Sequence, residues 1–202
     1  MLWLIVNVWI GTAAALAAAK PVTITVIGDS LSAGYGLERG DSFPARLKAA
    51  LEKDGIAARV IGAGVSGDTT AGGLSRLAWA LNDKPDLVIV ELGANDGLRG
   101  LDPAITEKNL DQMIARIKKR DIKVLLTGMQ APPNLGRDYA EAFNGVFPAL
   151  AEKHGVVFYP FFLEGVAARP ALNQDDGKHP NAKGVAVIVE RILPYVKDAL
   201  RQ

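Results

Sequence analysis

The chain of 202 residues carries 23 basic and 22 acidic side chains, which gives a net charge of +1, and it contains two histidines and no cysteine. A near-neutral charge offers no electrostatic basis for binding nucleic acid. Without cysteine the protein can form no disulfide, and two histidines leave little beyond carboxylates to hold zinc. The composition therefore argues against nucleic acid as a partner and predicts a protein that uses no metal.

The first 19 residues carry no charge and are almost entirely apolar, and they end in three alanines before Lys20. This pattern is typical of a secretory signal peptide with a small-residue cleavage site, and it leaves a single domain over residues 20–202. The alternative is an N-terminal membrane anchor, because 19 residues approach the ~20 needed to span a bilayer. We expect cleavage, a periplasmic or secreted product, and no stable membrane insertion afterwards.

Short apolar runs rich in β-branched residues alternate with longer helical patterns along the rest of the chain. The expected strands cover residues 22–27, 58–61, 87–91, 124–127 and 156–159. The expected helices cover residues 43–53, 70–81, 103–119, 139–153 and 182–200. Strands that are apolar throughout and separated by helices indicate a parallel sheet covered on both faces. We therefore predict an α/β domain, a three-layer α/β/α sandwich with a five-stranded, flavodoxin-like parallel sheet.

Polar residues follow several of these strands. Ser30 follows the first strand, Gly67 the second and Asn95 the third, while Asp176 and His179 fall in the long segment after the fifth. In open parallel sheets, ligands bind at the carboxyl ends of the strands. Acyl transfer requires a nucleophile, a base, a group that orients the base, and donors for an oxyanion. The predicted rim of the sheet supplies one of each.

The two histidines have different settings. His154 ends a helical pattern and precedes Gly155, where a cation suits the helix dipole and glycine can adopt the left-handed cap. We therefore interpret His154 as a helix terminus. His179 precedes Pro180, which disfavours helical backbone at the histidine, so His179 is the candidate base.

A second motif competes with this interpretation. Residues 62–67 read Gly-x-Gly-x-x-Gly after a strand and before a helix, as in dinucleotide-binding proteins. That fingerprint requires an acidic residue about 20 positions later at the end of the next strand, whereas Glu91 lies nearly 30 positions away. A nicotinamide or flavin cofactor is therefore disfavoured. The Gly-x-Ser-x-Gly elbow of α/β-hydrolases is also absent, so we expect Ser30 at the start of a loop or helix.

Four short sequence blocks, taken in their order along the chain, resemble the motifs of a known family. They are Gly-Asp-Ser-Leu-Ser at 28–32, Gly-Val-Ser-Gly-Asp-Thr at 64–69, Gly-Ala-Asn-Asp at 93–96, and Asp-Gly-Lys-His-Pro at 176–180. The chain resembles the SGNH hydrolases, also called the GDSL lipase/esterase family, from about residue 22 to its end. The longer strings at 28–35, 90–100 and 174–181 resemble the periplasmic bacterial thioesterase, lysophospholipase and arylesterase branch.

The resemblance implies that Ser30 is the nucleophile, His179 the general base and then acid, and Asp176 the carboxylate that orients His179. It also implies an oxyanion hole made by the backbone N–H groups of Ser30 and Gly67 and the side-chain amide of Asn95, with no cofactor. Asp175 is an alternative to Asp176. Taken singly, these residues also suit helix caps and turns.

Apolar residues near the predicted rim of the sheet bear on the substrate. Leu98, the loop over residues 130–136 with Pro132, and the run from Phe161 to Leu163 with Phe162 are candidates to line an acyl groove. The resemblance implies hydrolysis of acyl thioesters, lysophospholipids and aryl or short-chain esters. A carbohydrate acetylesterase is the rival enzyme, and a binding protein without turnover is the rival outside enzymes. A small acyl substrate is the expected partner, and the oligomeric state is left open with a monomer preferred.

Overall fold

The computed structural model describes residues 20–202, so the predicted signal peptide lies outside the described residues. Five strands pair in parallel in the order β2-β1-β3-β4-β5. This is the flavodoxin-like order, and it confirms the predicted sheet. The strands are β1 (Val22–Gly28), β2 (Ala58–Gly64), β3 (Leu87–Glu91), β4 (Lys123–Thr127) and β5 (Val157–Tyr159).

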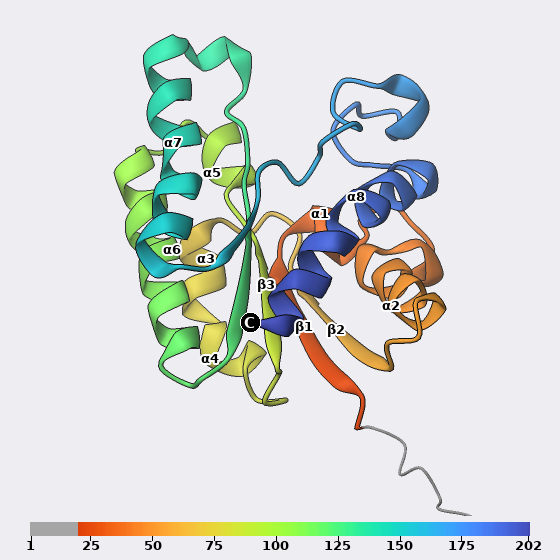
Figure 1. Cartoon of the computed structure of the whole chain (residues 1–202). Helices are drawn as coiled ribbons and strands as arrows, with labels where there is room; N and C mark the ends of the chain where they lie inside the picture. Colours follow the sequence, from red (N-terminus) through yellow and green to blue (C-terminus); the bar gives the residue numbers. More distant parts are fainter. Residues whose placement is uncertain (1–19) are drawn as a thin grey trace, which may run out of the picture.

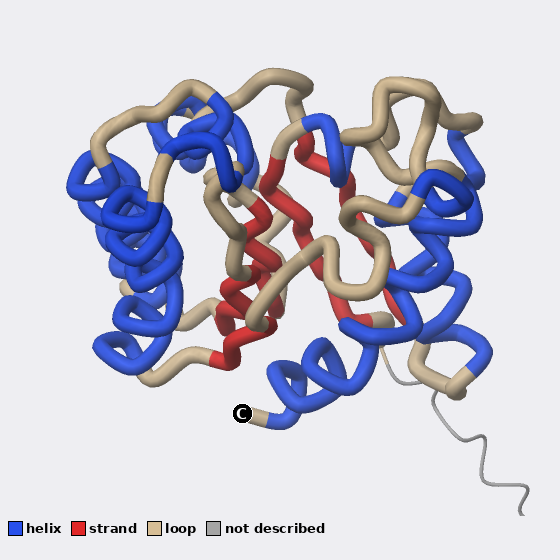
Figure 2. Tube along the Cα trace, turned by 90° about the horizontal axis from the view of Figure 1, so that it is seen from above, coloured by secondary structure: helices blue, strands red, loops and turns tan. Residues whose placement is uncertain are grey.

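Helices cover both faces of the sheet (Figures 1 and 2). The α-helices are α1 (Ser30–Ala33), α2 (Phe43–Lys53), α3 (Thr70–Ser75), α4 (Leu77–Ala80), α5 (Ala94–Leu98), α6 (Pro103–Lys118), α7 (Arg137–His154) and α8 (Ala182–Arg201). Three short 3-10 helices are η1 (Arg39–Asp41), η2 (Pro133–Leu135) and η3 (Pro170–Leu172). Helices α2 and α8 pack together on one face, and α3, α6 and α7 lie on the other (Figure 1). The predicted three-layer sandwich is thereby confirmed.

The core follows directly from the sequence pattern. All five residues of β3 are buried, as expected for a strand covered on both faces. On α8 the buried residues recur at the three- and four-residue spacing of one helix face, so that one side of the helix packs on the sheet: Val185, Ile188, Val189, Ile192, Val196 and Ala199. None of the helices within residues 20–202 has the length and apolar character needed to cross a bilayer.

One predicted helix is divided into two in the structure. The single helix expected over residues 70–81 is split into α3 and α4 at Arg76. The Arg76 guanidinium donates to the carbonyl oxygens of Gly28 and Ala63, at 2.8 and 2.5 Å, and pairs with the Asp68 carboxylate at 2.6 Å. Arg76 thus joins the ends of β1 and β2 to the loop that carries Gly67, and periodicity alone could not reveal this.

Two short helices at the carboxyl edge were not predicted. Helix α1 follows β1 and helix α5 follows β3, with four and five residues respectively. Both are too short to produce a helical hydrophobic repeat, and only α1 has a side-chain cap, from Asp29. They carry Ser30 and Asn95, so the local structure of the candidate site rests on them.

Candidate active site

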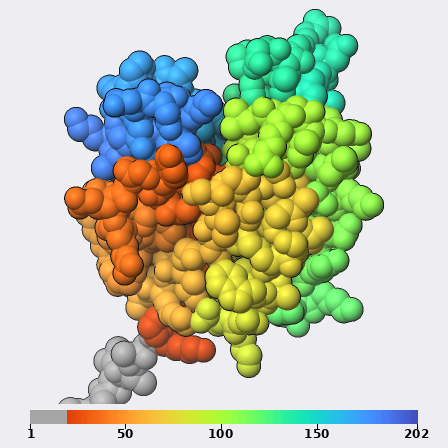
Figure 3. All heavy atoms as spheres, turned by 180° about the vertical axis from the view of Figure 1, so that it is seen from behind, coloured from red at the N-terminus to blue at the C-terminus, as the bar shows by residue number. Residues whose placement is uncertain are grey.

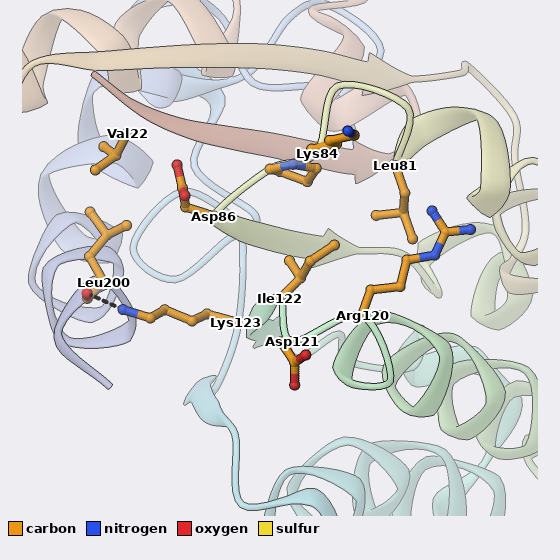
Figure 4. A pocket seen from close by; sticks show the side chains of 10 residues that line it. Val22, Leu81, Lys84, Asp86, Arg120, Asp121, Ile122, Lys123 and Leu200 are labelled. Atoms are coloured by element: carbon orange, nitrogen blue, oxygen red, sulfur yellow. Dashed lines mark hydrogen bonds between the residues drawn. The ribbon is translucent and has the colours of Figure 1, made fainter. Parts of the chain in front are cut away.

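Two cavities lie at opposite edges of the sheet. One of about 590 Å³ lies between the start of β1, the start of β4 and the C-terminal residues of α8 (Figure 4). Its polar lining consists of lysine, arginine and aspartate side chains, with Lys123 donating to the carbonyl of Leu200 at 2.5 Å. Neither a hydroxyl nor an imidazole lines it, so it offers no group for acyl transfer.

The other cavity, of about 540 Å³, lies at the carboxyl edge and contains Ser30, Asn95 and His179 among its lining residues. Its remaining walls come from the segments after β3, β4 and β5. From behind, the segment that carries His179 and the start of α7 rise as separate projections above this edge, blue and teal in Figure 3. The structure therefore places the predicted polar residues at the expected end of the sheet.

Ser30 is the first residue of α1, in agreement with the prediction that it begins a loop or helix. Asp29 is the N-cap, and its Oδ1 accepts the N–H of Leu31 at 2.9 Å. Gly34 ends the helix in the left-handed conformation with φ of 78°. A buried cap on one side and a glycine on the other hold the Ser30 side chain toward the cavity.

Ser30, His179 and Asp176 form a continuous hydrogen-bonded chain. Nε2 of His179 lies 2.9 Å from Oγ of Ser30, and Nδ1 lies 2.5 Å from Oδ2 of Asp176. An ionised carboxylate only accepts, so Nδ1 carries the proton and Nε2 accepts the hydroxyl of Ser30. Within the described chain, Asp175 makes no hydrogen bond to His179. The geometry thus selects Asp176 over its neighbour.

Asp176 is exposed, yet its charge is well supported. Its Oδ1 accepts the backbone N–H groups of His179 at 3.0 Å and Lys178 at 2.9 Å. The N–H of His179, the imidazole and the N–H of Lys178 together hold the pKa of Asp176 well below its usual range. The carboxylate therefore stays ionised and keeps its acceptor role toward Nδ1.

The three predicted oxyanion donors follow β1, β2 and β3, which are neighbours in the sheet. Among residues 20–202, no acceptor binds the backbone N–H of Ser30 or Gly67. The Asn95 amide instead donates both hydrogens within the protein, to Oδ2 of Asp29 at 3.0 Å and to the carbonyl of Asp68 at 2.9 Å. For Asn95 to bind an oxyanion, the bond to Asp68 must be released or shared.

Gly67 has φ of 84°, a conformation that favours glycine, and is exposed beside the cavity without lining it. Its carbonyl accepts from the guanidinium of Arg99 at 2.9 Å. This bond orients the peptide group that follows Gly67 and joins the loop after β2 to the end of α5.

Two carboxyl groups that the sequence did not identify as functional lie beneath Ser30. Asp29 and Glu91 are both completely buried, and Oε2 of Glu91 accepts the backbone N–H of Asp29 at 3.3 Å. Burial raises the pKa of Asp29 to about 6, and burial likewise raises the pKa of Glu91 well above its usual value. Oε1 of Glu91 has no hydrogen-bond partner in the described structure.

The sequence signal for this pair was present but ambiguous. Asp29 lies in the Gly-Asp-Ser block, and Glu91 is the one charge in an otherwise apolar strand. The opposed residue, Gly28, explains how Glu91 fits: a Cβ on Gly28 would lie 2.4 Å from Oε2 of Glu91. Only the pairing of β1 with β3 reveals that these two positions meet.

The predicted acyl-groove residues divide between the cavity and the core. Leu98 and Pro132 line the cavity, together with Phe161 and Leu163. Phe162 has no exposed surface and packs edge-on against Phe43, with ring centroids 5.1 Å apart. The structure therefore corrects the prediction for Phe162, because successive residues after β5 point in opposite directions and only its neighbours face the cavity.

The two remaining alternatives are also located. His154 lies at the C-terminus of α7, where Nε2 is 2.6 Å from the Asp111 carboxylate, and Gly155 caps the helix with φ of 60°. Gly62 and Gly64 of the glycine motif lie within β2 rather than in a turn, so this segment does not form a phosphate-binding loop. No three His, Asp or Glu side chains within residues 20–202 are grouped as metal ligands.

Comparison with known proteins identifies the family. A sequence model of the GDSL-like Lipase/Acylhydrolase family matches residues 26–187. The chain is 44% identical to Esterase TesA of Pseudomonas aeruginosa, over 88% of this chain and 89% of that protein. It is 43% identical to Thioesterase 1/protease 1/lysophospholipase L1 of Escherichia coli K12, over 81% of this chain and 78% of that protein.

A solved structure agrees with the sequence comparisons. The crystal structure of AlinE4, described as an SGNH-hydrolase family esterase, matches with a TM-score of 0.76 at 51% identity, covering 89% of this chain and 97% of that one. The family model covers most of the chain, and both relatives exceed 40% identity. The chain therefore belongs to the GDSL (SGNH) family of ester hydrolases.

Proposed function

We propose that the protein is a serine esterase that hydrolyses acyl esters or thioesters through an acyl-enzyme on Ser30. The observation that carries the proposal is the hydrogen-bonded chain from Ser30 through His179 to Asp176, with distances of 2.9 and 2.5 Å. This arrangement supplies a hydroxyl, a base within reach of its proton, and a carboxylate that fixes the tautomer of the base.

The reaction follows from the position of each proton. Nε2 of His179 accepts the proton of Ser30 as Oγ attacks the acyl carbon, and Asp176 stabilises the imidazolium that forms. His179 then returns the proton to the alcohol or thiol as it leaves, and the acyl group remains on Oγ. Water, deprotonated by the same imidazole, attacks the acyl-enzyme, which releases the carboxylic acid and restores Ser30.

The oxyanion of both tetrahedral intermediates would accept hydrogen bonds from the N–H groups of Ser30 and Gly67 and from the Asn95 amide. Support comes from the two backbone donors, which have no acceptor among the described residues, and from the position of all three after adjacent strands. The two backbone donors are fixed before the reaction and stabilise developing charge without a cost of reorganisation, whereas the Asn95 amide must first release or share its bond to Asp68.

The cavity favours an acyl chain as the bound group. Apolar side chains make up much of its lining beside Ser30 and His179: Leu98, Met129, Pro132, Phe161 and Leu163. A volume of about 540 Å³ lies within the range of ligand pockets. We therefore prefer arylesterase, acyl-CoA thioesterase or lysophospholipase substrates to acetylated sugars, which would require more polar partners in the walls.

The test compares Ser30→Ala with the wild-type protein on a chromogenic acyl ester. We expect the variant to lose hydrolysis while keeping its circular dichroism and melting temperature. A fluorophosphonate probe should label the wild type at Ser30 alone, as identified by peptide mass. Wild-type turnover in Ser30→Ala, or labelling at another residue, would overturn the proposal.

A substrate panel addresses the acyl group. Esters, acyl-CoA thioesters and lysophospholipids of graded chain length should show higher kcat/KM as the chain fills the cavity. Activity confined to acetylated sugars would replace this substrate class with its rival.

The apolar leader predicts export of the protein. The intact mass of the protein recovered outside the cytoplasm should match residues 20–202. A mass that includes the first 19 residues would support a membrane anchor instead.

A further inference from the structure

One glutamine joins the loop that follows the nucleophile to the loop that carries the histidine. Nε2 of Gln174 donates to the carbonyl of Tyr35 at 2.7 Å and to the carbonyl of Pro180 at 3.0 Å. Tyr35 lies five positions after Ser30, and Pro180 directly follows His179. A single side-chain amide therefore bonds to both arms of the candidate site.

Gln174 is also fixed to the histidine loop through its backbone. Its N–H donates to the carbonyl of His179 at 2.8 Å, and its own carbonyl accepts the N–H of Gly177 at 2.9 Å. An antiparallel bridge between Asn173 and Pro180 closes the loop at its base. The histidine loop thus behaves as one unit, and Gln174 is the point at which this unit is attached to the nucleophile side.

Few hydrogen bonds join the nucleophile loop to the histidine loop in the described structure. Within the described chain, the Gln174 contact and the Ser30–His179 bond are the only hydrogen bonds that join residues 30–37 to residues 173–181. The Ser30–His179 bond is broken and remade during acyl transfer, so it cannot by itself maintain the distance between the two groups. The Gln174 amide is not consumed by the reaction.

The nucleophile side is shaped to receive this amide. Gly36 has φ of 71°, and a Cβ at this position would lie 2.2 Å from Oε1 of Gln174. The ring of Tyr35 lies against the imidazole of His179, with centroids 4.6 Å apart and planes at 37°. The carbonyl that Gln174 holds therefore belongs to the residue whose ring contacts the base.

We propose that Gln174 is a positioning residue that keeps His179 within hydrogen-bond distance of Ser30 by joining their loops. The proposal rests on the catalytic roles given under the proposed function. Its energetic basis is the sensitivity of acid–base catalysis to placement, since a misplacement of 1 Å costs up to roughly a hundredfold in rate. Loss of the amide leaves the substrate cavity intact, so the effect falls on kcat rather than on KM.

The first test uses Gln174→Ala and Gln174→Glu. The glutamate keeps the length of the side chain but loses the donors and faces two carbonyl oxygens. We expect both variants to lower kcat roughly tenfold to a hundredfold, to leave KM within about twofold, and to slow fluorophosphonate labelling of Ser30 in the same proportion. Asp175→Ala, in the same exposed loop, is the matched control and should keep the wild-type kcat.

A second test does not depend on removing the glutamine. Gly36→Ala should displace the Gln174 side chain and lower kcat in the same direction, and the double variant Gly36→Ala/Gln174→Ala should lose less than the product of the two single losses. Fully multiplicative losses would show that Gly36 acts independently of Gln174 and would count against the proposal.

The outcomes separate this inference from the proposed function. If Ser30→Ala is inactive while both Gln174 variants keep kcat and labelling rate within about twofold of the wild type, the positioning role is wrong and the esterase proposal stands. If the wild type shows no hydrolysis that depends on Ser30, the proposed function itself fails. A fall in kcat that is matched by a lower melting temperature in Gln174→Glu would also contradict positioning, because a structural defect would then explain it.

Discussion

The two halves of the site are built in different ways. Ser30 and Asn95 lie on short helices that directly follow β1 and β3, and the carboxyl groups of Asp29 and Glu91 beneath them are completely buried. His179 lies 20 positions after Tyr159, the last residue of β5, on a loop with exposed residues. The sheet places the nucleophile half, whereas side-chain hydrogen bonds place the histidine half.

The difference is clearest in the carboxyl groups. Burial raises the pKa of Asp29 to about 6, while hydrogen bonds from His179 and Lys178 hold the pKa of Asp176 below its usual range. A carboxylate that must stay charged to orient the imidazole is thus found in the exposed half, where donors surround it. The buried half contains carboxyl groups that support the backbone and the Asn95 amide.

The largest expected effect concerns the exposed half. Asp176→Asn should lower kcat by roughly 10⁴-fold, because the amide favours the tautomer of His179 that cannot accept the proton of Ser30. The measurement is kcat on a chromogenic ester together with circular dichroism at the same pH, which should show that the fold is kept. Asp175→Asn is the matched control and should retain activity. If the two variants exchanged these results, the assignment of the acid would be wrong.

The next effect tests the nucleophile half. Asn95→Ala should lower kcat by roughly a hundred- to a thousandfold, as expected for the loss of one oxyanion donor. KM should change less, because the amide contacts the oxyanion only as the tetrahedral species forms. Asn82→Ala, at an exposed position beyond α4, is the control. A wild-type kcat in Asn95→Ala would mean that Asn95 does not bind the oxyanion and that the backbone donors alone stabilise it.

Much of the architecture could be predicted because its signals are local. Apolar strand runs separated by helical patterns predicted the five strands and their parallel arrangement. Asp102 is the N-cap of α6, where its side chain accepts the N–H of Ala104 at 2.9 Å. The absence of the α/β-hydrolase elbow predicted Ser30 at the start of a loop or helix, and it begins α1. These features depend on residues that are close in sequence.

The features that could not be predicted depend on contacts across the chain. Arg76 lies where the predicted helix is interrupted, and its side chain binds the carbonyl oxygens at the ends of two strands. Phe162 is buried in the core, while the residues on either side of it line the cavity. Gln174 contacts Tyr35 across 139 positions of sequence. The type of a residue does not specify which distant residue it contacts. Gln174 and Glu91 therefore lie in the strings 174–181 and 90–100 that resemble the family, but the sequence predicted no role for them.

A smaller effect, on stability, tests whether close packing holds the nucleophile half. Gly28→Ala would place a Cβ 2.2 Å from Oγ of Ser32 and 2.7 Å from the backbone carbonyl oxygen of Glu91. We expect a loss of roughly 1–3 kcal/mol in the free energy of unfolding, measured with urea, because the backbone oxygen cannot move aside. Gly40→Ala meets no atom within 4 Å and should be nearly neutral. Equal losses in both variants would contradict the packing argument.

The smallest effect is a difference in how stability depends on pH. Glu91 has a raised pKa in the folded protein, so its contribution to stability is greatest below its unfolded value of 4.5 and falls as the pH rises from there toward the folded value. Asp176 has a lowered pKa, so its contribution is present above its unfolded value of 3.8 and is lost as the pH falls below it. The buried and exposed halves should therefore respond in opposite directions.

Urea unfolding of the wild type, Glu91→Gln and Asp176→Asn across this range measures both responses. Relative to the wild type, Glu91→Gln should gain stability as the pH rises above about 4.5, by at most about 1.4 kcal/mol per pH unit for one proton. Asp176→Asn should lose stability relative to the wild type as the pH rises through about 4, because only the wild type gains the ionised, hydrogen-bonded carboxylate. Parallel curves of unfolding free energy against pH for all three proteins would mean that each carboxyl group has the same pKa in the folded and unfolded states. The two halves of the site would then differ in geometry alone.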